Sequence, residues 1–191
     1  EAGKEYEGYT KVEKTEDPKK VAVIGAGPAG MEAAQVAVKR GHEVTLFEKN
    51  SEIGGALYYV SMPDFKLDYK DYTDYMIRET KEVVKDIRTD TEVTADMIND
   101  GGYDVAIVAS GAETFIPAIP GTEKGGILDP LKVLDGKETT GDRVIVCGAG
   151  LVGCEVAMVL AEQGKDVTMV DMLPTAAPEL AIYTKWVLDA K

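Results

Sequence analysis

Glycine-rich turns, each followed at a fixed distance by an acid, are the residues of this sequence best suited to chemistry. The first turn is Gly25-Ala26-Gly27-Pro28-Ala29-Gly30, between a short apolar run and an Ala- and Val-rich segment of helical character. Glu48 ends the next apolar run, 23 positions after the first glycine. The order of strand, glycine turn, helix, strand and acid predicts a crossover unit that binds a dinucleotide.

The glycines and the acid of this turn each have a physical reason to be there. Gly25 permits a tight turn, a side chain at Gly27 would collide with a pyrophosphate, and Gly30 lets the helix lie close to the strand. The free N–H groups and the dipole at the helix start favour a bound diphosphate. Glu48, at the carboxyl end of the second strand, can accept hydrogen bonds from ribose hydroxyls.

The same pattern recurs 123 positions later in the chain. Gly148, Gly150 and Gly153 follow an apolar run, a helical segment comes next, and a further apolar run closes on Asp171. This acid again lies 23 positions after the first glycine of its turn. A repeat that aligns without a gap is harder to obtain by chance than either copy alone. We therefore predict two nucleotide-binding units.

Two dinucleotide sites on one polypeptide suggest a flavin that exchanges electrons with a nicotinamide, since hydride transfer needs the two rings stacked. Asp171 favours NADH over NADPH, because a 2′-phosphate about 4 Å from a carboxylate meets ~1–4 kcal/mol of repulsion. No arginine follows in residues 172–174 to reverse this effect. The expected preference for NADH is roughly tenfold or more.

Composition and charge exclude several classes of function. The 191 residues carry a net charge of −13 and no basic patch, which argues against nucleic acids and anionic membranes as partners. No apolar run approaches the ~20 residues of a membrane span. The two cysteines, Cys147 and Cys154, form no metal-binding or disulfide motif, so we predict no metal site and expect both to pack in the core. A reducing cytoplasm is the expected location.

Other segments complete the predicted fold. Residues 66–85 have helical periodicity, with Tyr69, Tyr72 and Met76 as a core-facing stripe. Residues 103–109 are apolar without alternation, which predicts a buried parallel strand. We expect His42 to be a solvated surface residue.

The predicted fold class is α/β, with a Rossmann-like FAD/NAD(P)-binding fold in which helices flank a parallel sheet. Residues 1–19 are a linker or arm, and 20–116 are the N-terminal part of an FAD-binding domain. Residues 117–142 are a crossover, and 143–191 are a truncated NAD(P)-binding domain that ends in a helical segment with Ile182, Trp186 and Leu188. Since the chain begins with Glu1 rather than Met, we expect a fragment or a processed product.

The combined motifs resemble those of the two-dinucleotide-binding-domain flavoproteins. Within that group, the run EIGGAL…MPDFKLD and the acidic arm before the first strand are most similar to the C-terminal part of certain NADH:flavin oxidoreductases. These are the relatives of 2-enoate reductase and 2,4-dienoyl-CoA reductase. The resemblance implies an upstream barrel that carries FMN and a 4Fe-4S cluster, neither of which belongs to this chain.

The resemblance also implies roles for individual residues, although it assigns none to catalysis. The implied FAD contacts are Gly25, Ala26, Gly27, Pro28, Ala29 and Gly30 at the pyrophosphate, Glu48 with Lys49 at the ribose, Gly54, Gly55 and Leu57 on the flavin side, Val93 at the adenine, and Ser110 and Gly111 where the family usually has Thr-Gly. The implied NAD contacts are Gly148, Gly150, Leu151, Val152 and Gly153 at the pyrophosphate, and Asp171 at the ribose. A late Gly-Asp strand of the family would lie beyond Lys191.

The function that follows is an electron-transfer module. The resemblance implies that FAD accepts hydride from NADH and relays electrons to the FMN and iron-sulfur centre of the upstream part, which would reduce an enoate-type substrate. Two alternatives stay open: a module that binds ADP or FAD without turnover, and a subunit similar to the small subunit of glutamate synthase. The partner is the upstream domain, and a homo-oligomer is possible.

Overall fold

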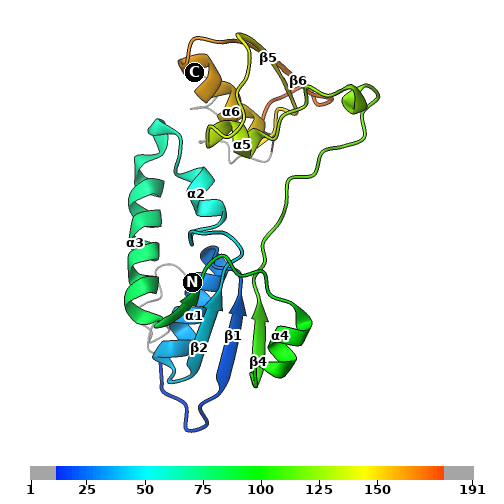
Figure 1. The fold of residues 1–191 in the computed structure, drawn as a ribbon. Coiled ribbons are helices and arrows are strands. Elements are labelled where there is room, and N and C mark those ends of the chain that lie inside the picture. The colour runs from blue at the N-terminus through cyan, green and yellow to red at the C-terminus, as the bar shows by residue number, and fades with distance from the viewer. Residues whose placement is uncertain (1–11, 179–191) are drawn as a thin grey trace. The chain divides into compact units, whose positions relative to one another are not determined.

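The computed structural model describes residues 12–178 of the chain, which divides into two compact units, Glu1–Glu113 and Thr114–Lys191 (Figure 1). The predicted helical segment with Ile182, Trp186 and Leu188 lies outside the described residues, as does the beginning of the predicted arm. The boundary between the units falls close to the predicted end of the first domain. Within residues 12–178, no helix combines the length and hydrophobicity that crossing a membrane requires.

The first unit contains a four-stranded parallel sheet in the order β3-β2-β1-β4. The strands are β1 (Lys20–Ile24), β2 (Glu43–Phe47), β3 (Asp86–Arg88) and β4 (Val105–Val108). The helices are α1 (Pro28–Lys39), α2 (Ala56–Val60), α3 (Leu67–Val83) and α4 (Ala95–Asp100), with a 3₁₀ turn at Asp64–Lys66. A parallel sheet with flanking helices confirms the predicted fold class.

The core of this unit lies between α1, α3 and the strands. Val23 on β1, Leu46 on β2, and Met31 and Ala34 on α1 are fully buried. Small alanines along α1 let this helix pack closely against β1 and β2. The sheet and helix that position the first glycine turn are therefore the best-packed part of the unit.

Helix α3 forms where the periodicity predicts it, but the predicted stripe is wrong for the two tyrosines. Tyr69 and Tyr72 are 51% and 50% exposed, whereas Thr73, Met76 and Thr80 are buried. Residues three and four apart share a helix face, so the buried stripe passes through the threonines. Their hydroxyls donate to backbone oxygens four residues earlier, at 2.7 Å in both cases, which removes the cost of burying them.

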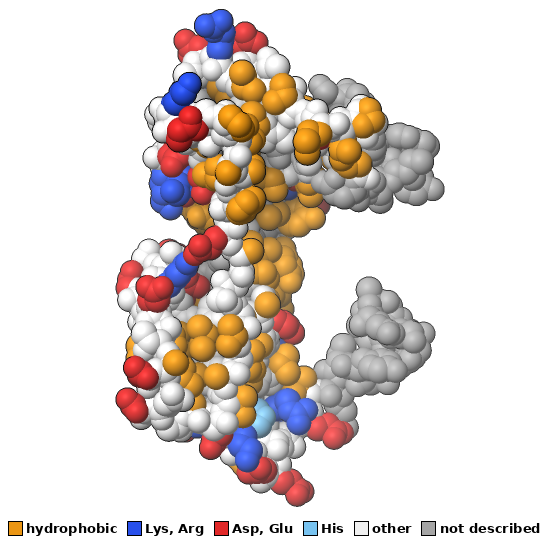
Figure 2. All heavy atoms as spheres, turned by 90° about the vertical axis from the view of Figure 1, so that its right-hand side faces the viewer, with side chains coloured by type: hydrophobic (Ala, Val, Ile, Leu, Met, Phe, Trp, Pro, Cys, Tyr) orange, Lys and Arg blue, Asp and Glu red, His pale blue; other side chains and the backbone are white. Residues whose placement is uncertain are grey.

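Strand β4 is exposed, so the prediction of a buried strand is wrong. Val105 and Val108 are 43% and 72% exposed, and β4 pairs only with β1 among the described strands. An apolar run shows that a strand can be buried, but it does not specify which elements cover it. Figure 2 faces the side of Figure 1 on which β4 and α4 lie, and it shows hydrophobic side chains at the surface.

The second unit repeats the beginning of the first. It contains α5 (Pro130–Leu134), β5 (Arg143–Cys147), α6 (Leu151–Glu162) and β6 (Asp166–Val170), with a 3₁₀ turn at Thr122–Lys124. The bounds of β5, α6 and β6 are those of β1, α1 and β2 moved by 123 positions. The parallel register moves by the same amount, from Lys20↔Glu43 to Arg143↔Asp166. The internal repeat predicted from the sequence is therefore confirmed as a structural repeat.

The two cysteines differ in burial. Cys154 on α6 is 2% exposed, and its thiol donates to the Ala149 carbonyl oxygen at 3.4 Å. Cys147 at the end of β5 is exposed, so the expectation of core packing is wrong for this residue. Side chains alternate between the two faces of a strand, and Cys147 shares the more exposed face of β5 with Arg143 and Ile145.

Candidate functional site

The first glycine turn connects the carboxyl end of β1 to the start of α1, where Gly27 is the N-cap residue. Gly25 has a φ of +99°, which side chains of L-residues rarely adopt. A Cβ atom at Gly25 would also lie 2.3 Å from the carbonyl oxygen of Ala109. Backbone conformation and space both require glycine at this position.

Gly30 and Gly27 serve different purposes in the turn. A Cβ atom at Gly30 would lie 1.8 Å from the Gly25 carbonyl oxygen, so glycine allows the helix to contact the backbone of the turn. A Cβ atom at Gly27 would have only the Gly55 Cα near it, at 3.9 Å. Nothing in the described protein therefore fills the space beside Gly27 at the helix start, where N–H groups without helical partners favour an anion.

The predicted flavin-side glycines pack directly against this turn. The Gly54 N–H donates to the Ala26 carbonyl oxygen at 2.8 Å. Gly55 has a φ of +52°, and a Cβ atom there would lie 2.7 Å from the Gly27 Cα. Helix α2 follows with half-buried Leu57 in its first turn. The structure thus brings two separate glycine-containing segments together at one end of β1.

Glu48 lies buried beside the turn, with 5% of its surface exposed. Its Oε2 accepts a hydrogen bond from the Ala26 N–H at 2.9 Å. Its Oε1 accepts from the N–H and the side-chain Nδ2 of Asn50, at 2.9 and 2.8 Å. Lys49 points its ammonium group elsewhere, 3.3 Å from Glu113. The sequence analysis missed Asn50, although a short polar residue two positions after the acid was the available signal.

The other predicted FAD contacts lie on neighbouring loops. Ser110 and Gly111 follow β4, and the Ser110 Cα would be 3.2 Å from a Cβ atom built on Gly25. Val93 is half-buried in the connection between β3 and α4. That connection starts beside the loop after β2, because the Thr91 N–H donates to the Glu48 carbonyl oxygen at 2.9 Å. The predicted residues therefore lie on loops that follow the carboxyl ends of the parallel strands.

The second glycine turn repeats this geometry. Gly148 has a φ of +108°, and a Cβ atom at Gly153 would lie 1.9 Å from the Gly148 carbonyl oxygen. Asp171 Oδ2 accepts from the Ala149 N–H at 2.6 Å, as Glu48 does from Ala26. Leu151 and Val152, the remaining predicted NAD contacts, are the first two residues of α6. In each turn, a carboxylate at the end of the second strand thus accepts a hydrogen bond from the N–H of the second turn residue.

Backbone donors stabilise the ionised form of Asp171. The Leu173 N–H, 2.7 Å from Oδ1, has the largest effect on the pKa of this carboxyl, followed by the Ala149 N–H. Together they lower the pKa of Asp171 below its ordinary value. The equivalence between the two units extends further, since the Ala177 N–H donates to the Ala149 carbonyl oxygen as Gly54 does to Ala26.

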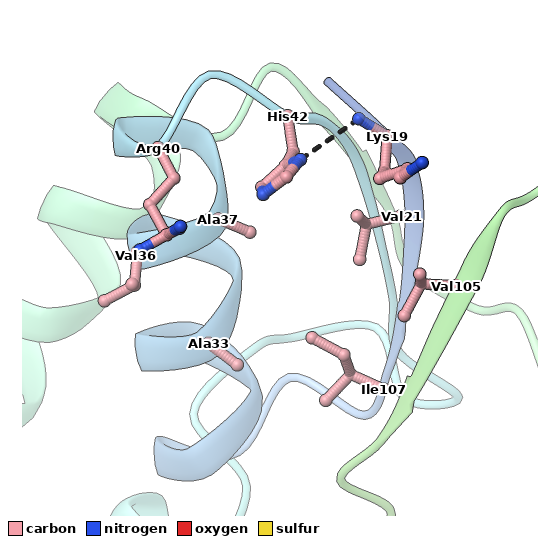
Figure 3. A pocket seen from close by; sticks show the side chains of 9 residues that line it. All are labelled: Lys19, Val21, Ala33, Val36, Ala37, Arg40, His42, Val105 and Ile107. Atoms are coloured by element: carbon pink, nitrogen blue, oxygen red, sulfur yellow. Dashed lines mark hydrogen bonds between the residues drawn. The ribbon is translucent and has the colours of Figure 1, made fainter. Parts of the chain in front are cut away.

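An open apolar groove of about 340 Å³ lies at the other end of the first unit's strands, away from the glycine turn. Figure 3 shows Val21 and Ile107 facing Ala33 and Ala37, with His42 at one end. Figure 2 shows the histidine among basic and hydrophobic side chains. His42 is half-buried and its Nδ1 accepts from the Lys19 N–H at 3.1 Å, so the expected solvated histidine is wrong. The groove is lined by Lys19, Val21, Ala33, Val36, Ala37, Arg40, His42, Val105 and Ile107, and by none of the predicted site residues.

Comparison with known proteins identifies the family. The model of the pyridine nucleotide-disulphide oxidoreductases matches residues 2–59 and 19–181 of this chain. The chain belongs to this family. The predicted membership of the two-dinucleotide flavoproteins is confirmed, and so is the predicted likeness to the enoate reductase group.

Individual relatives of this oxidoreductase chain are reductases of greater length. It is 43% identical over 179 residues to bilirubin reductase of Mediterraneibacter gnavus, covering 94% of the chain and 28% of that protein. It is 38% identical over 161 residues to cinnamate reductase of Clostridium sporogenes, covering 84% and 24%. The structure of a 2-naphthoyl-CoA reductase complex matches with a TM-score of 0.87 and 31% identity, covering 94% and 28%. The chain therefore spans about a quarter of the length of these proteins.

Proposed function

We propose that this chain is the FAD- and NADH-binding module of a longer reductase. The observation that carries the proposal is the repeated turn geometry, in which an acid at the end of the second strand accepts from the second residue of a glycine turn. One such turn suits one dinucleotide, and two turns suit the exchange of electrons between a flavin and a nicotinamide. The first turn is assigned to FAD because Gly54 and Gly55 extend it with backbone that can approach a long cofactor.

The residues of the first turn fit a bound dinucleotide. Open space beside Gly27 and the N–H groups at the start of α1 suit a diphosphate. Glu48 is held by its hydrogen bonds in one orientation, which suits a fixed contact with the ribose. FAD, when bound, supplies a flavin that accepts hydride and passes electrons on. The role of this chain is to bind and orient the two cofactors, and it contributes no side chain assigned to proton transfer.

The destination of the electrons lies outside this chain in the proposal. Relatives named cinnamate reductase and 2-naphthoyl-CoA reductase support a conjugated, enoate-type acid or thioester as the substrate. We propose that an upstream barrel with FMN and a 4Fe-4S cluster binds that substrate and receives electrons from FAD. That barrel would be the partner of this module, and no residue described here would contact the substrate.

The proposed function is tested by anaerobic titration of the purified full-length protein with NADH. Flavin absorbance that falls stepwise until about two and a half equivalents of NADH are added supports electron transfer through this module, because FAD, FMN and a 4Fe-4S cluster together take up about five electrons. A full-length protein that releases ADP and no FAD on denaturation supports the alternative of a binding module without turnover. A flavin that stays oxidised in the presence of excess NADH contradicts the proposal.

We expect the full-length protein to bind NADH at least roughly tenfold more tightly than NADPH, because the Asp171 carboxylate repels a 2′-phosphate. Since backbone donors lower the pKa of Asp171, the carboxylate stays ionised and the preference should persist at about pH 5. The variant Asp171→Asn removes the charge and should reduce the preference to roughly twofold. Dissociation constants from isothermal titration calorimetry measure both ratios. Similar constants for NADH and NADPH in the unmodified protein would contradict this role of Asp171.

A further inference from the structure

We propose that Asn50, together with Glu48, binds the adenosine ribose in the first dinucleotide site. Its carboxamide orients the Glu48 carboxylate and supplies the second acceptor for the two ribose hydroxyls. This inference rests on the proposed function, since it assumes that the first turn binds a dinucleotide. It adds a residue that the motif, with its glycines and acid, does not contain.

Internal hydrogen bonds occupy most of the acceptor positions of Glu48. A carboxylate offers about four such positions, two on each oxygen. Oε1 already accepts from the N–H and Nδ2 of Asn50, and Oε2 accepts from the Ala26 N–H. One position therefore remains, on Oε2, for a ligand. An adenosine ribose presents two neighbouring hydroxyls, so Glu48 cannot accept both unless it gives up an internal hydrogen bond.

The carboxamide of Asn50 also carries an acceptor, its carbonyl oxygen. Its Nδ2 lies 2.8 Å from Glu48 Oε1, and the opposite orientation would set its carbonyl oxygen against a carboxylate. The carbonyl oxygen of the same planar group is thus an acceptor held close to the carboxylate. Asn50 is an exposed residue, so its carboxamide lies where a ligand from solvent can approach. Glu48 and Asn50 together offer one acceptor to each hydroxyl.

The second turn lacks an equivalent carboxamide. Leu173 stands where the first unit has Asn50, and its N–H repeats the backbone hydrogen bond to the acid at 2.7 Å. Leucine has no side-chain donor, so the hydrogen bonds that hold Asp171 come from backbone N–H groups and not from a carboxamide. Asp171 is also exposed, whereas Glu48 is buried. The second acid can therefore turn toward a ligand without a side-chain partner, whereas the first is fixed by Asn50 and shares the ribose with it.

The test uses apoprotein of the full-length polypeptide, titrated with FAD and followed by flavin fluorescence. ADP, 2′-deoxy-ADP and 3′-deoxy-ADP then compete against FAD, so that each reports on the first site. The variant Asn50→Leu copies the second unit and removes both functions of the carboxamide. The matched control Asn99→Leu makes the same chemical change at an exposed position of α4. Thermal unfolding of each apoprotein checks that the variants fold.

We expect Asn50→Leu to weaken FAD binding about fivefold to tenfold, which corresponds to the loss of one hydrogen bond, and Asn99→Leu to leave it unchanged. One of the two deoxy nucleotides should compete less well than ADP against the unmodified protein, but as well as ADP against Asn50→Leu. If the effects of Asn50→Leu and of removing one hydroxyl are not additive, Asn50 contacts that hydroxyl. A purely structural role of Asn50 would give additive effects.

Each remaining outcome has a defined meaning. FAD binding within twofold of the unmodified protein, or the same penalty for both deoxy nucleotides in Asn50→Leu as in the unmodified protein, overturns the role of Asn50 alone. Failure of the unmodified apoprotein to bind FAD overturns the proposed function, and the inference about Asn50 with it.

Discussion

Gly30→Ala is expected to lower the free energy of unfolding of the first unit by at least about 3 kcal/mol. The new Cβ atom would lie 1.8 Å from the Gly25 carbonyl oxygen. Because this oxygen belongs to the backbone, no side-chain rotation can relieve the clash. Helix α1 would have to move away from the sheet, which loosens the packing of the fully buried Met31 and Ala34. Urea denaturation followed by circular dichroism measures the change.

Two further glycines provide the comparison for Gly30→Ala. Gly41 also has a positive φ, +93°, but a Cβ atom there would meet nothing within 4 Å, so Gly41→Ala should cost only about 1 kcal/mol of backbone strain. Gly153→Ala repeats the clash in the second unit, at 1.9 Å from the Gly148 carbonyl oxygen, and should destabilise that unit to a similar degree. If Gly30→Ala costs no more than Gly41→Ala, close contact between helix and turn is not what requires glycine.

The repeat could be predicted from the sequence because its signals are local. Each glycine turn, each apolar run and each acid lies within a segment of about thirty residues, the size of one crossover unit. The bounds of β5, α6 and β6 match those of β1, α1 and β2 for the same reason. The start of α4 is also set locally, because the hydroxyl of Thr94, the N-cap residue, accepts from the Met97 N–H three positions later.

The burial of individual side chains could not be predicted in the same way. Whether Tyr72 or Cys147 is covered depends on which elements pack against it, and this is decided by segments far away in the sequence. A threonine such as Thr80 enters the core only because its hydroxyl finds an internal acceptor and also accepts from Gln35 at 2.9 Å. The partial burial of His42 was equally hard to predict, because its hydrogen-bond partner, Lys19, lies 23 positions away in the sequence.

The sequence motif names candidate site residues, but it does not give the hydrogen bonds among them. The motif predicts that Glu48 and Asp171 contact ribose, but it does not reveal that both carboxylates accept from the second residue of their turns. This contact depends on the direction of a backbone N–H, which follows from the conformation of Gly25 and Gly148. An acid at this position therefore has two physical functions: to hold the turn and to offer acceptors to a ligand.

Gly27→Ala is expected to weaken FAD binding by the full-length protein at least roughly 100-fold without destabilising the apoprotein. Gly27 has an extended backbone conformation, with φ of −75° and ψ of −175°, that alanine adopts without strain. Its new methyl group would lie 3.9 Å from the Gly55 Cα, an ordinary contact. The methyl group would instead occupy the space beside the helix start that the proposed diphosphate needs. FAD affinity from flavin fluorescence and apoprotein stability from urea denaturation measure the two effects separately.

Matched substitutions separate this effect from a general loss of affinity. Gly150, the N-cap of α6, has nearly the same conformation as Gly27, so Gly150→Ala should weaken NADH binding and leave FAD binding intact. Gly141→Ala adds a methyl group to open space at an ordinary φ and should change neither affinity. Gly27→Ala and Gly150→Ala would then each remove one cofactor, because each turn binds its own dinucleotide. Retention of FAD by Gly27→Ala with unchanged affinity would show that the diphosphate does not lie against the start of α1.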